Sequence, residues 1–174
     1  MAEKLGIPLN QIVTINFTHL GIEEGQISSV LTGIRARYCR WAKRPGKRRR
    51  ADPFEPAMIW VVENNGHAAC HLLTHVPPGR LANFKAELAG WIEKECLVKP
   101  EGSALDVRPA HNPHGFRKYM LKGIDPLFAA LYRIRHVPQG PVLGKRFGYT
   151  QNLGPSQCRK HGTKKPYRWP RQAG

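Results

Sequence analysis

The chain has 174 residues, of which 41% are apolar, and it carries a formal net charge of +16 at pH 7. This length and composition fit one folded domain with a sizeable core and argue against a disordered chain. The sequence contains neither a secretory leader nor an apolar run as long as a membrane span, so we expect a cytoplasmic protein. Its four cysteines include no C-x-x-C pair, which predicts reduced thiols rather than a zinc ribbon or a disulfide scaffold.

The basic residues are concentrated in two blocks that flank a nearly neutral middle. Residues 35–50 contain nine basic and no acidic residues, and residues 126–174 contain ten basic and no acidic residues. Residues 52–125 hold eight basic and nine acidic residues. This distribution indicates a surface that binds a polyanion, and we favour nucleic acid over a solvated charge run. The cations expected to contact nucleic acid are Arg35, Arg40, Arg44, Lys47, Arg48, Arg49, Arg50, Lys145, Arg146, Arg159 and Lys160.

The first predicted elements are a strand and a long helix. Residues 11–19, "QIVTINFTH", alternate apolar and polar side chains, as a half-buried strand does. Residues 23–44 repeat apolar side chains every three or four positions, with acids at the start and bases at the end, which favours an amphipathic helix. The basic stretch at 45–53 then predicts an exposed loop.

The later elements complete an alternating pattern of strands and helices. An Asn-Asn-Gly turn between two runs of β-formers predicts a hairpin, and Gly123 is expected to cap a short helix. In order, we predict strands at 57–63 and 68–76, a helix at 80–95, a strand at 104–110, and helices at 115–123 and 125–134. This order predicts an α+β fold with a ferredoxin-like antiparallel sheet and helices on one face over residues 1–135. A basic Gly/Pro-rich tail is expected over 136–174.

Three histidines follow the hairpin turn at even spacing, after an upstream Glu63. His67, His71 and His75 are four residues apart, so neighbouring pairs on a regular strand would be about 13 Å apart at Cα. That distance argues against one metal ion shared by the three imidazoles. Across the hairpin, Glu63 and His71 could bind a divalent ion and leave positions for water or phosphate. The alternative, polar residues on an open sheet face, stays open.

A second candidate for chemistry is the pair Tyr119 and Lys122. These residues are three apart on the predicted helix at 115–123, so they are neighbours on one face. A phenol with a pKa near 10 becomes a useful nucleophile when a nearby cation stabilises its anion. A tyrosine that only packs against the sheet is the alternative here.

Taken in order, three motifs resemble those of the HUH superfamily of rolling-circle replication initiators from plasmids and phages. "TINFT" at 14–18 is similar to the first strand motif of that family, and "YMLK" at 119–122 to its Y-x-x-K helix. "ENNGHAACHLLTHVPPG" at 63–79 is similar to its His-hydrophobic-His strand with an upstream Glu. The resemblance covers about residues 11–123 and implies the HUH palm on the predicted core.

The resemblance also implies an activity and its residues. The family nicks single-stranded or hairpin DNA, so Tyr119 would attack the scissile phosphate and give a 5′-phosphotyrosyl enzyme with a free 3′-OH, while Lys122 orients the phosphate or stabilises the phenolate. Mg²⁺ or Mn²⁺ would be bound by Glu63 and His71. The first histidine of the family motif would fall at position 69, where this chain has Ala69, and His67 is the candidate substitute.

The remaining expectations concern the partners. The basic blocks would hold the DNA backbone, and Trp41, Trp169 or Tyr167 would stack on unpaired bases. The sequence has no G-x-x-x-x-G-K-[ST] loop, so a helicase would be a separate protein. Ala69 keeps a second function open, a degenerate or unrelated basic protein that binds nucleic acid without cutting it. An RNA-binding or ribosome-associated module would explain the charge but not the ordered motifs.

Overall fold

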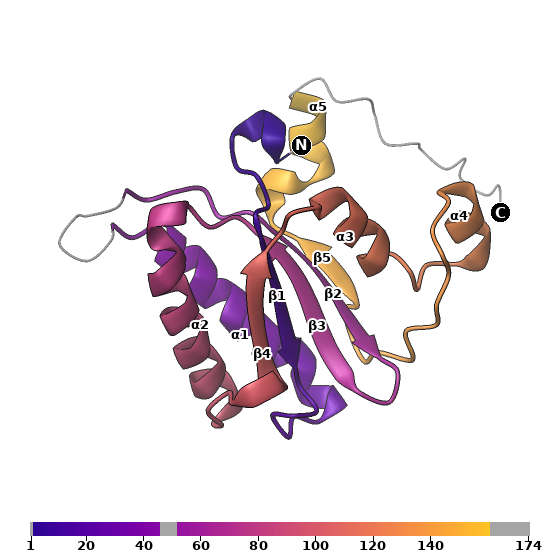
Figure 1. Cartoon of the computed structure of the whole chain (residues 1–174), viewed down its shortest axis with the longest axis horizontal. Helices are drawn as coiled ribbons and strands as arrows, with labels where there is room; N and C mark the ends of the chain where they lie inside the picture. Colours follow the sequence, from indigo (N-terminus) through magenta and orange to yellow (C-terminus); the bar gives the residue numbers. More distant parts are fainter. Residues whose placement is uncertain (1, 46–51, 161–174) are drawn as a thin grey trace.

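The fold is built on one five-stranded antiparallel sheet with the strand order β4-β1-β3-β2-β5, shown in Figure 1. The computed structural model describes residues 2–45 and 52–160. The α+β class predicted from the sequence is confirmed. The strands are β1 (Gln11–Asn16), β2 (Met58–Asn64), β3 (Ala68–Thr74), β4 (Leu105–Pro109) and β5 (Phe147–Tyr149).

Helices α1 to α4 lie in segments predicted as helices, whereas α5 lies in the segment predicted as a tail. In the described ranges, no helix is both long and apolar enough to cross a bilayer. Short 3₁₀ turns lie at Glu3–Leu5, Pro78–Arg80, Gly102–Ala104 and Gln151–Leu153. The α-helices are α1 (Glu24–Ala42), α2 (Leu81–Cys96), α3 (Pro113–Met120), α4 (Pro126–Leu131) and α5 (Pro155–Lys160).

One face of the sheet carries the main core under α1 and α2. Because side chains alternate along a strand, every second residue of the central strands points to this face. Ile15 of β1, Trp60 of β2 and Leu72 of β3 are at most 1% exposed there. The apolar stripes of α1 and α2 pack on them side by side (Figure 1), which buries the aromatic rings of Tyr38 and Phe84. This layer holds the sheet rigid behind the opposite face.

The opposite face of the sheet is partly covered by α3. Ile12, Val61 and Leu73 form a second apolar cluster with Met120 of α3, and Phe116 packs against it. The prediction that the helices lie on one face is therefore correct for α1 and α2 and wrong for α3. The physical reason is the four-residue spacing of Phe116 and Met120, which gives α3 an apolar side of its own. As a result, α3 lies over the face that carries His71.

A fifth strand lies within the segment that the sequence predicted as a tail. The three residues of β5 pair with β2, with Gly148 opposite Trp60. Gly148 is buried, and a Cβ added to it would overlap the indole ring of Trp60. Glycine is therefore what allows the backbone of β5 to approach the sheet at this point.

We expect Gly148→Ala to destabilise the protein by about 1–3 kcal/mol, because the new methyl group must displace Trp60 or β5. Urea unfolding followed by tryptophan fluorescence measures the change. Gly90→Ala in α2 is the control: its added Cβ meets no atom within 4 Å, so stability should stay equal or rise. An unfolding midpoint for Gly148→Ala equal to that of the wild type would contradict the packing of β5 on Trp60.

Candidate active site

The structure brings Glu63 and His71 together on the α3 face of the sheet. His71 of β3 pairs with Val61 of β2, and Glu63, two residues further along β2, pairs with Ala69. Residues two apart on a strand share a face, so the side chains of Glu63 and His71 are diagonal neighbours. Their Oε1 and Nε2 atoms are 2.6 Å apart. The predicted Glu63–His71 pair is thus present in the structure.

Both ring nitrogens of His71 have a partner. The Thr14 hydroxyl lies 3.2 Å from Nδ1, and the Glu63 carboxylate lies against Nε2. A neutral imidazole can accept from the hydroxyl at Nδ1 while its Nε2–H donates to the carboxylate. These two contacts fix the orientation of the ring, and they give Thr14 of the "TINFT" motif a structural role.

Helix α3 places Tyr119 and Lys122 beside this pair. The Tyr119 hydroxyl donates to Glu63 Oε1 at 3.3 Å and lies 3.5 Å from His71 Nε2. The Lys122 ammonium lies 2.8 Å from Glu63 Oε2 and 4.0 Å from the centroid of the Tyr119 ring. The predicted helix ends at Met120 rather than at Gly123, so Lys122 lies in the turn that follows α3. The two residues are neighbours all the same.

Gln139 completes the cluster, and sequence reasoning did not select it. Its side chain is buried, and the side-chain amide donates to Glu63 Oε2 at 3.1 Å. Its backbone carbonyl accepts from the backbone N–H of Asn64 at 2.7 Å. A Cβ on Gly123 would overlap the Gln139 side chain. Gly123 therefore makes room for Gln139 and is not the helix cap that the sequence predicted. The only sequence signal for this contact is a pair of glycines, Gly123 and Gly140, at which an added Cβ would overlap a neighbouring residue.

The electrostatics of the cluster keep Glu63 ionised. The hydrogen bond from His71 is the largest cause that lowers the pKa of Glu63, from its usual 4.5 to about 2; burial opposes the shift, and Lys122 adds to it. Burial acts to lower the pKa of Lys122, but its hydrogen bonds to Glu63 and Tyr119 outweigh this effect and raise that pKa. At neutral pH the site therefore holds a carboxylate and an ammonium group on two sides of the phenol.

An open groove of about 550 Å³ lies beside the phenol. Its floor is formed by Thr14 and His71, and its walls by Arg108, by His111 and by the α3 residues that precede Tyr119. Phe116 stacks on the Tyr119 ring with centroids 5.5 Å apart, and Tyr119 itself is 41% exposed. The phenol therefore lies between a solvent-accessible groove and the charged cluster.

The two candidate metal donors, Glu63 and His71, lie in direct contact. Glu63 Oε1 and His71 Nε2 are hydrogen-bonded to each other, and the Tyr119 hydroxyl lies within 3.5 Å of both atoms. Within residues 2–45 and 52–160, no three His, Cys, Asp or Glu side chains gather as a metal-binding group. Mg²⁺ commonly takes one or two protein ligands and completes its shell with water and phosphate oxygens. A pair of protein donors is therefore a sufficient number for this ion. His67 is exposed in the hairpin turn and is not brought to this pair.

We expect Ala69→His to tighten Mn²⁺ binding about tenfold or more. Ala69 lies directly opposite Glu63 in the β2–β3 register, where Cβ atoms of paired residues are about 5 Å apart. An imidazole at this position would add a third donor to the Glu63–His71 pair. Isothermal titration calorimetry with MnCl₂ measures the affinity, with His67→Ala as the control that should leave it unchanged. Equal Mn²⁺ affinity of Ala69→His and wild type would contradict this geometry.

The cations predicted to contact nucleic acid do not form one surface. Arg35 lies 3.5 Å above the Trp60 ring, and Lys145 approaches the same ring at 5.6 Å. Arg40 and Arg44 lie together at the end of α1, and the Arg146 guanidinium donates to the carbonyl of Gly140. Arg159 and Lys160 are exposed in α5, and Lys47, Arg48, Arg49 and Arg50 lie outside the described residues.

Comparison of the chain with protein-family models, with curated proteins and with solved structures found no match.

Proposed function

We propose that this protein is a single-stranded-DNA endonuclease that nicks its substrate through Tyr119. The observation that carries the proposal is the meeting of four groups at one point. A partly exposed phenol lies beside an open groove, within 3.5 Å of a carboxylate oxygen and an imidazole nitrogen, with an ammonium group against its ring. A phenol that only packed on the sheet would not need the charged partners that this one has.

The strand order supports the same proposal. The first four strands have the order β4-β1-β3-β2 and are linked through α1 and α2. This is a ferredoxin-like arrangement, as the proposed relation to the HUH palm requires. In this arrangement, β1 and β3 are central, so Thr14 and His71 lie in the middle of the sheet. Tyr119 follows β4 on α3 and reaches the same face. Residues from the three motifs, Thr14, His71 and Tyr119, are therefore neighbours on one face of the sheet.

In the proposed reaction, the Tyr119 oxygen bonds to phosphorus as the bond between phosphorus and the 3′ oxygen breaks. The phenol gives its proton to solvent at the open groove, and the released 3′ oxygen takes a proton from solvent to become a free 3′-OH. The downstream fragment stays on the enzyme, with its 5′ phosphate joined to Tyr119 as a phosphotyrosyl ester. Lys122 is placed to stabilise the phenolate and the charge that develops on the phosphate oxygens.

Glu63 and His71 are the residues that would hold Mg²⁺ or Mn²⁺. When bound, such an ion supplies positive charge to the phosphate oxygens of the substrate. Thr14 and Gln139 keep the two donor side chains in place, through His71 Nδ1 and Glu63 Oε2 respectively. A single-stranded region, alone or at a hairpin, is the proposed substrate, because the phosphate must enter an open groove beside α3.

One observation favours a second function, binding of nucleic acid without cleavage. Ala69 stands opposite Glu63, where a further donor would strengthen the metal site. If the two remaining donors do not hold an ion on the substrate, the basic chain would bind DNA and leave it intact.

The test is a nicking assay with two end labels and MnCl₂. A 5′-labelled oligonucleotide panel should give a shortened free product, and the same panel labelled at the 3′ end should give a band that stays attached to the protein in a denaturing gel. Both labels are needed, because hydrolysis by a contaminating nuclease gives the first band without the second. Binding with neither band would replace the nuclease by the second function.

A further inference from the structure

A second feature suited to nucleic acid is a basic hollow of about 590 Å³ between the C-terminal half of α1 and α2. Its small residues, Ala86 and Gly90, leave the floor open, and a Cβ on Gly90 would meet no atom within 4 Å. Five cations line it, and Glu87 is the one acid among the described lining residues. These cations are Arg37, Arg40, Arg44, Arg80 and Lys94.

Two of the five cations are used within the protein. The Arg37 Nε atom lies 2.6 Å from the Glu95 carboxylate. The buried Arg80 donates to the carbonyls of Arg44 and Trp41; burial lowers its pKa, and Glu87 opposes this shift. These contacts hold Arg37 and Arg80 in the wall of the hollow. The remaining three cations are the ones available to bind an external anion.

The other three cations are exposed. Arg40, Arg44 and Lys94 make no ion pair with a residue that the structure describes. Arg40 lies in the last turn of α1, Arg44 lies two residues beyond the helix end, and Lys94 of α2 lines the same hollow. Three exposed like charges around one hollow repel one another, and a polyanion would relieve this repulsion.

The hollow offers charge rather than a stacking surface. Trp41 and Trp91 line it but are only 8% and 6% exposed, and the Trp41 indole N–H is bound to Asn83. The expectation that Trp41 stacks on an unpaired base is therefore wrong for this conformation. Binding of single strands without sequence preference depends on accessible aromatic rings, whereas binding of a duplex depends on phosphate contacts. The chemistry of the hollow thus matches a duplex backbone.

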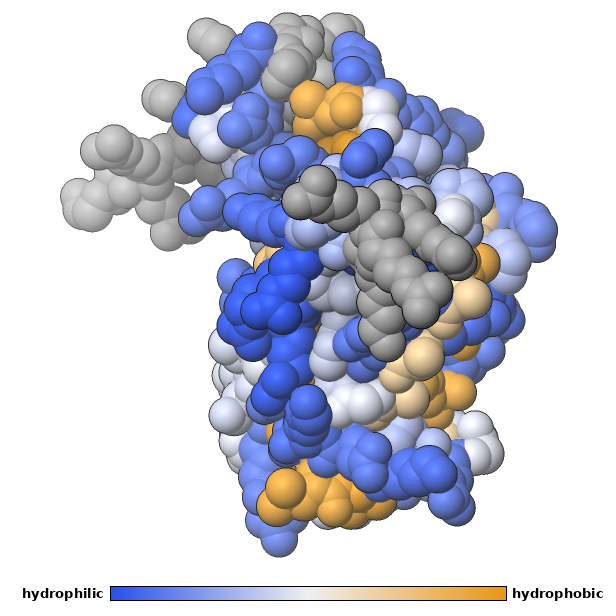
Figure 2. Space-filling view, turned by 90° about the vertical axis from the view of Figure 1, so that its left-hand side faces the viewer, coloured by the Kyte–Doolittle hydropathy of each residue, from blue (hydrophilic) through white to orange (hydrophobic). Residues whose placement is uncertain are grey.

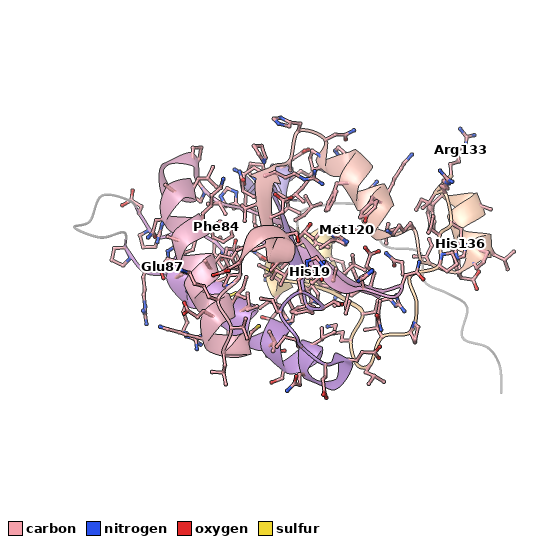
Figure 3. The ribbon with its side chains drawn as sticks, turned by 60° about the horizontal axis from the view of Figure 1, so that its bottom comes forward. His19, Phe84, Glu87, Met120, Arg133 and His136 are labelled. Carbon is pink, nitrogen blue, oxygen red and sulfur yellow. The ribbon has the colours of Figure 1, made fainter. Side chains whose placement is uncertain are left out.

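The hollow and the candidate active site lie on opposite sides of the sheet. Figure 3 shows the labelled Glu87 on α2, well separated from Met120 of α3. Figure 2, which looks at the side of the molecule where α2 lies in Figure 1, shows a concentration of strongly hydrophilic residues there. A strand in the groove at Tyr119 would therefore not occupy the hollow.

We infer that the basic hollow binds the phosphate backbone of a duplex DNA arm that flanks the single-stranded region cut at Tyr119. The choice of DNA over RNA rests on the proposed function; the binding of phosphates rests on the hollow itself. The arm is bound without regard to its sequence, because the contacts are made by Arg40, Arg44 and Lys94 to phosphates.

The test is fluorescence anisotropy with three labelled ligands, in full-length protein carrying Tyr119→Phe so that no ligand is cut. The ligands are a DNA hairpin with a single-stranded extension, the extension alone, and an RNA hairpin of the same sequence. The triple variant Arg40→Ala/Arg44→Ala/Lys94→Ala is compared with Lys4→Ala/Lys99→Ala/Arg135→Ala, which removes the same charge from exposed positions outside the hollow. Each affinity is measured at several salt concentrations.

For the DNA hairpin, the hollow variant should lose about tenfold or more in affinity. The negative slope of log binding constant against log salt concentration should become shallower by about 2 to 3, since each of the three phosphate contacts contributes about 0.9. The extension alone and the control variant should change less than about twofold. An equal loss for the extension, an unchanged hairpin affinity, or tighter binding of the RNA hairpin would each overturn the inference.

Failure of this inference can be told from failure of the proposed function. Cleavage of the short extension by the wild-type protein tests the proposed function alone, because the hollow lies on the other side of the sheet. A wild-type protein that cuts no ligand contradicts the proposed function, and the hairpin affinities still decide the inference about the hollow.

Discussion

Tyr119→Phe is expected to abolish DNA cleavage and the covalent protein–DNA band while leaving DNA binding unchanged. Phenylalanine keeps the stack on Phe116 and the edge contact with the His71 ring, whose centroid lies 5.3 Å away, but it has no oxygen to bond to phosphorus. The rate should fall by about 10³-fold or more, as it does when a catalytic nucleophile is removed. The two lost hydrogen bonds are long, at 3.3 and 3.5 Å. The free energy of unfolding should therefore change by less than about 1 kcal/mol.

The matched control for this substitution is Tyr132→Phe. Tyr132 is 60% exposed at the end of α4 and also loses only a hydroxyl. It should cut DNA at the wild-type rate. A covalent band that persists in Tyr119→Phe, measured on the 3′-labelled strand, would mean that another residue is the nucleophile and would end the proposed mechanism.

Glu63→Gln is expected to reduce cleavage by about 10²-fold or more and to destabilise the fold at pH 7 by an amount of the order of 2 kcal/mol. One carboxylate serves His71, Tyr119, Lys122 and Gln139. A neutral amide cannot balance the Lys122 ammonium, and it offers an N–H where two donors now point. The variant should therefore lose both the order of the site and the charge pairing at its base.

The stability difference should depend on pH with a definite sign. Since folding lowers the pKa of Glu63 from 4.5 to about 2, its stabilisation is complete above pH 4.5 and disappears as the pH falls towards 2. The stability gap between wild type and Glu63→Gln should therefore stay constant from pH 6 to about pH 4.5 and narrow as the pH falls to 3, as measured by urea unfolding at several pH values. The exposed Glu93→Gln on α2 is the control and should match the wild type throughout. A gap that stays constant down to pH 3 would show that Glu63 is not held as an ion pair.

Much of the sheet could be predicted because its sequence signals are local. The alternation in "QIVTINFTH" and the Asn-Asn-Gly turn fix which residues share a face, and this alone puts Glu63 near His71 across the hairpin. The pairing of Tyr119 with Lys122 follows from their spacing of three residues. What spacing could not give is that α3 turns this pair towards the hairpin, because that depends on Phe116 and Met120 fitting an apolar patch on distant strands.

Gln139 and β5 could not be predicted because their partners are remote in sequence. Gln139 is 76 residues from Glu63, and β5 has three residues, too few for an alternating pattern to be recognised. The Gly and Pro content and the basic charge of this region indicated a tail. In the structure, Gly148 of this region admits Trp60, and Gly123, which precedes the region, admits the Gln139 side chain.

The contact of Gln139 with Glu63 also sets an order of events during synthesis of the chain. Glu63, His71, Tyr119 and Lys122 leave the ribosome first, but the carboxylate lacks one of its donors, and β2 lacks its outer neighbour, until residues 139–149 have emerged. A nascent chain that stops before this point would expose the edge of β2, a surface on which strands of other chains can pair. Emergence of residues 139–149 is thus expected to cover this edge in the same step that adds the last donor to Glu63.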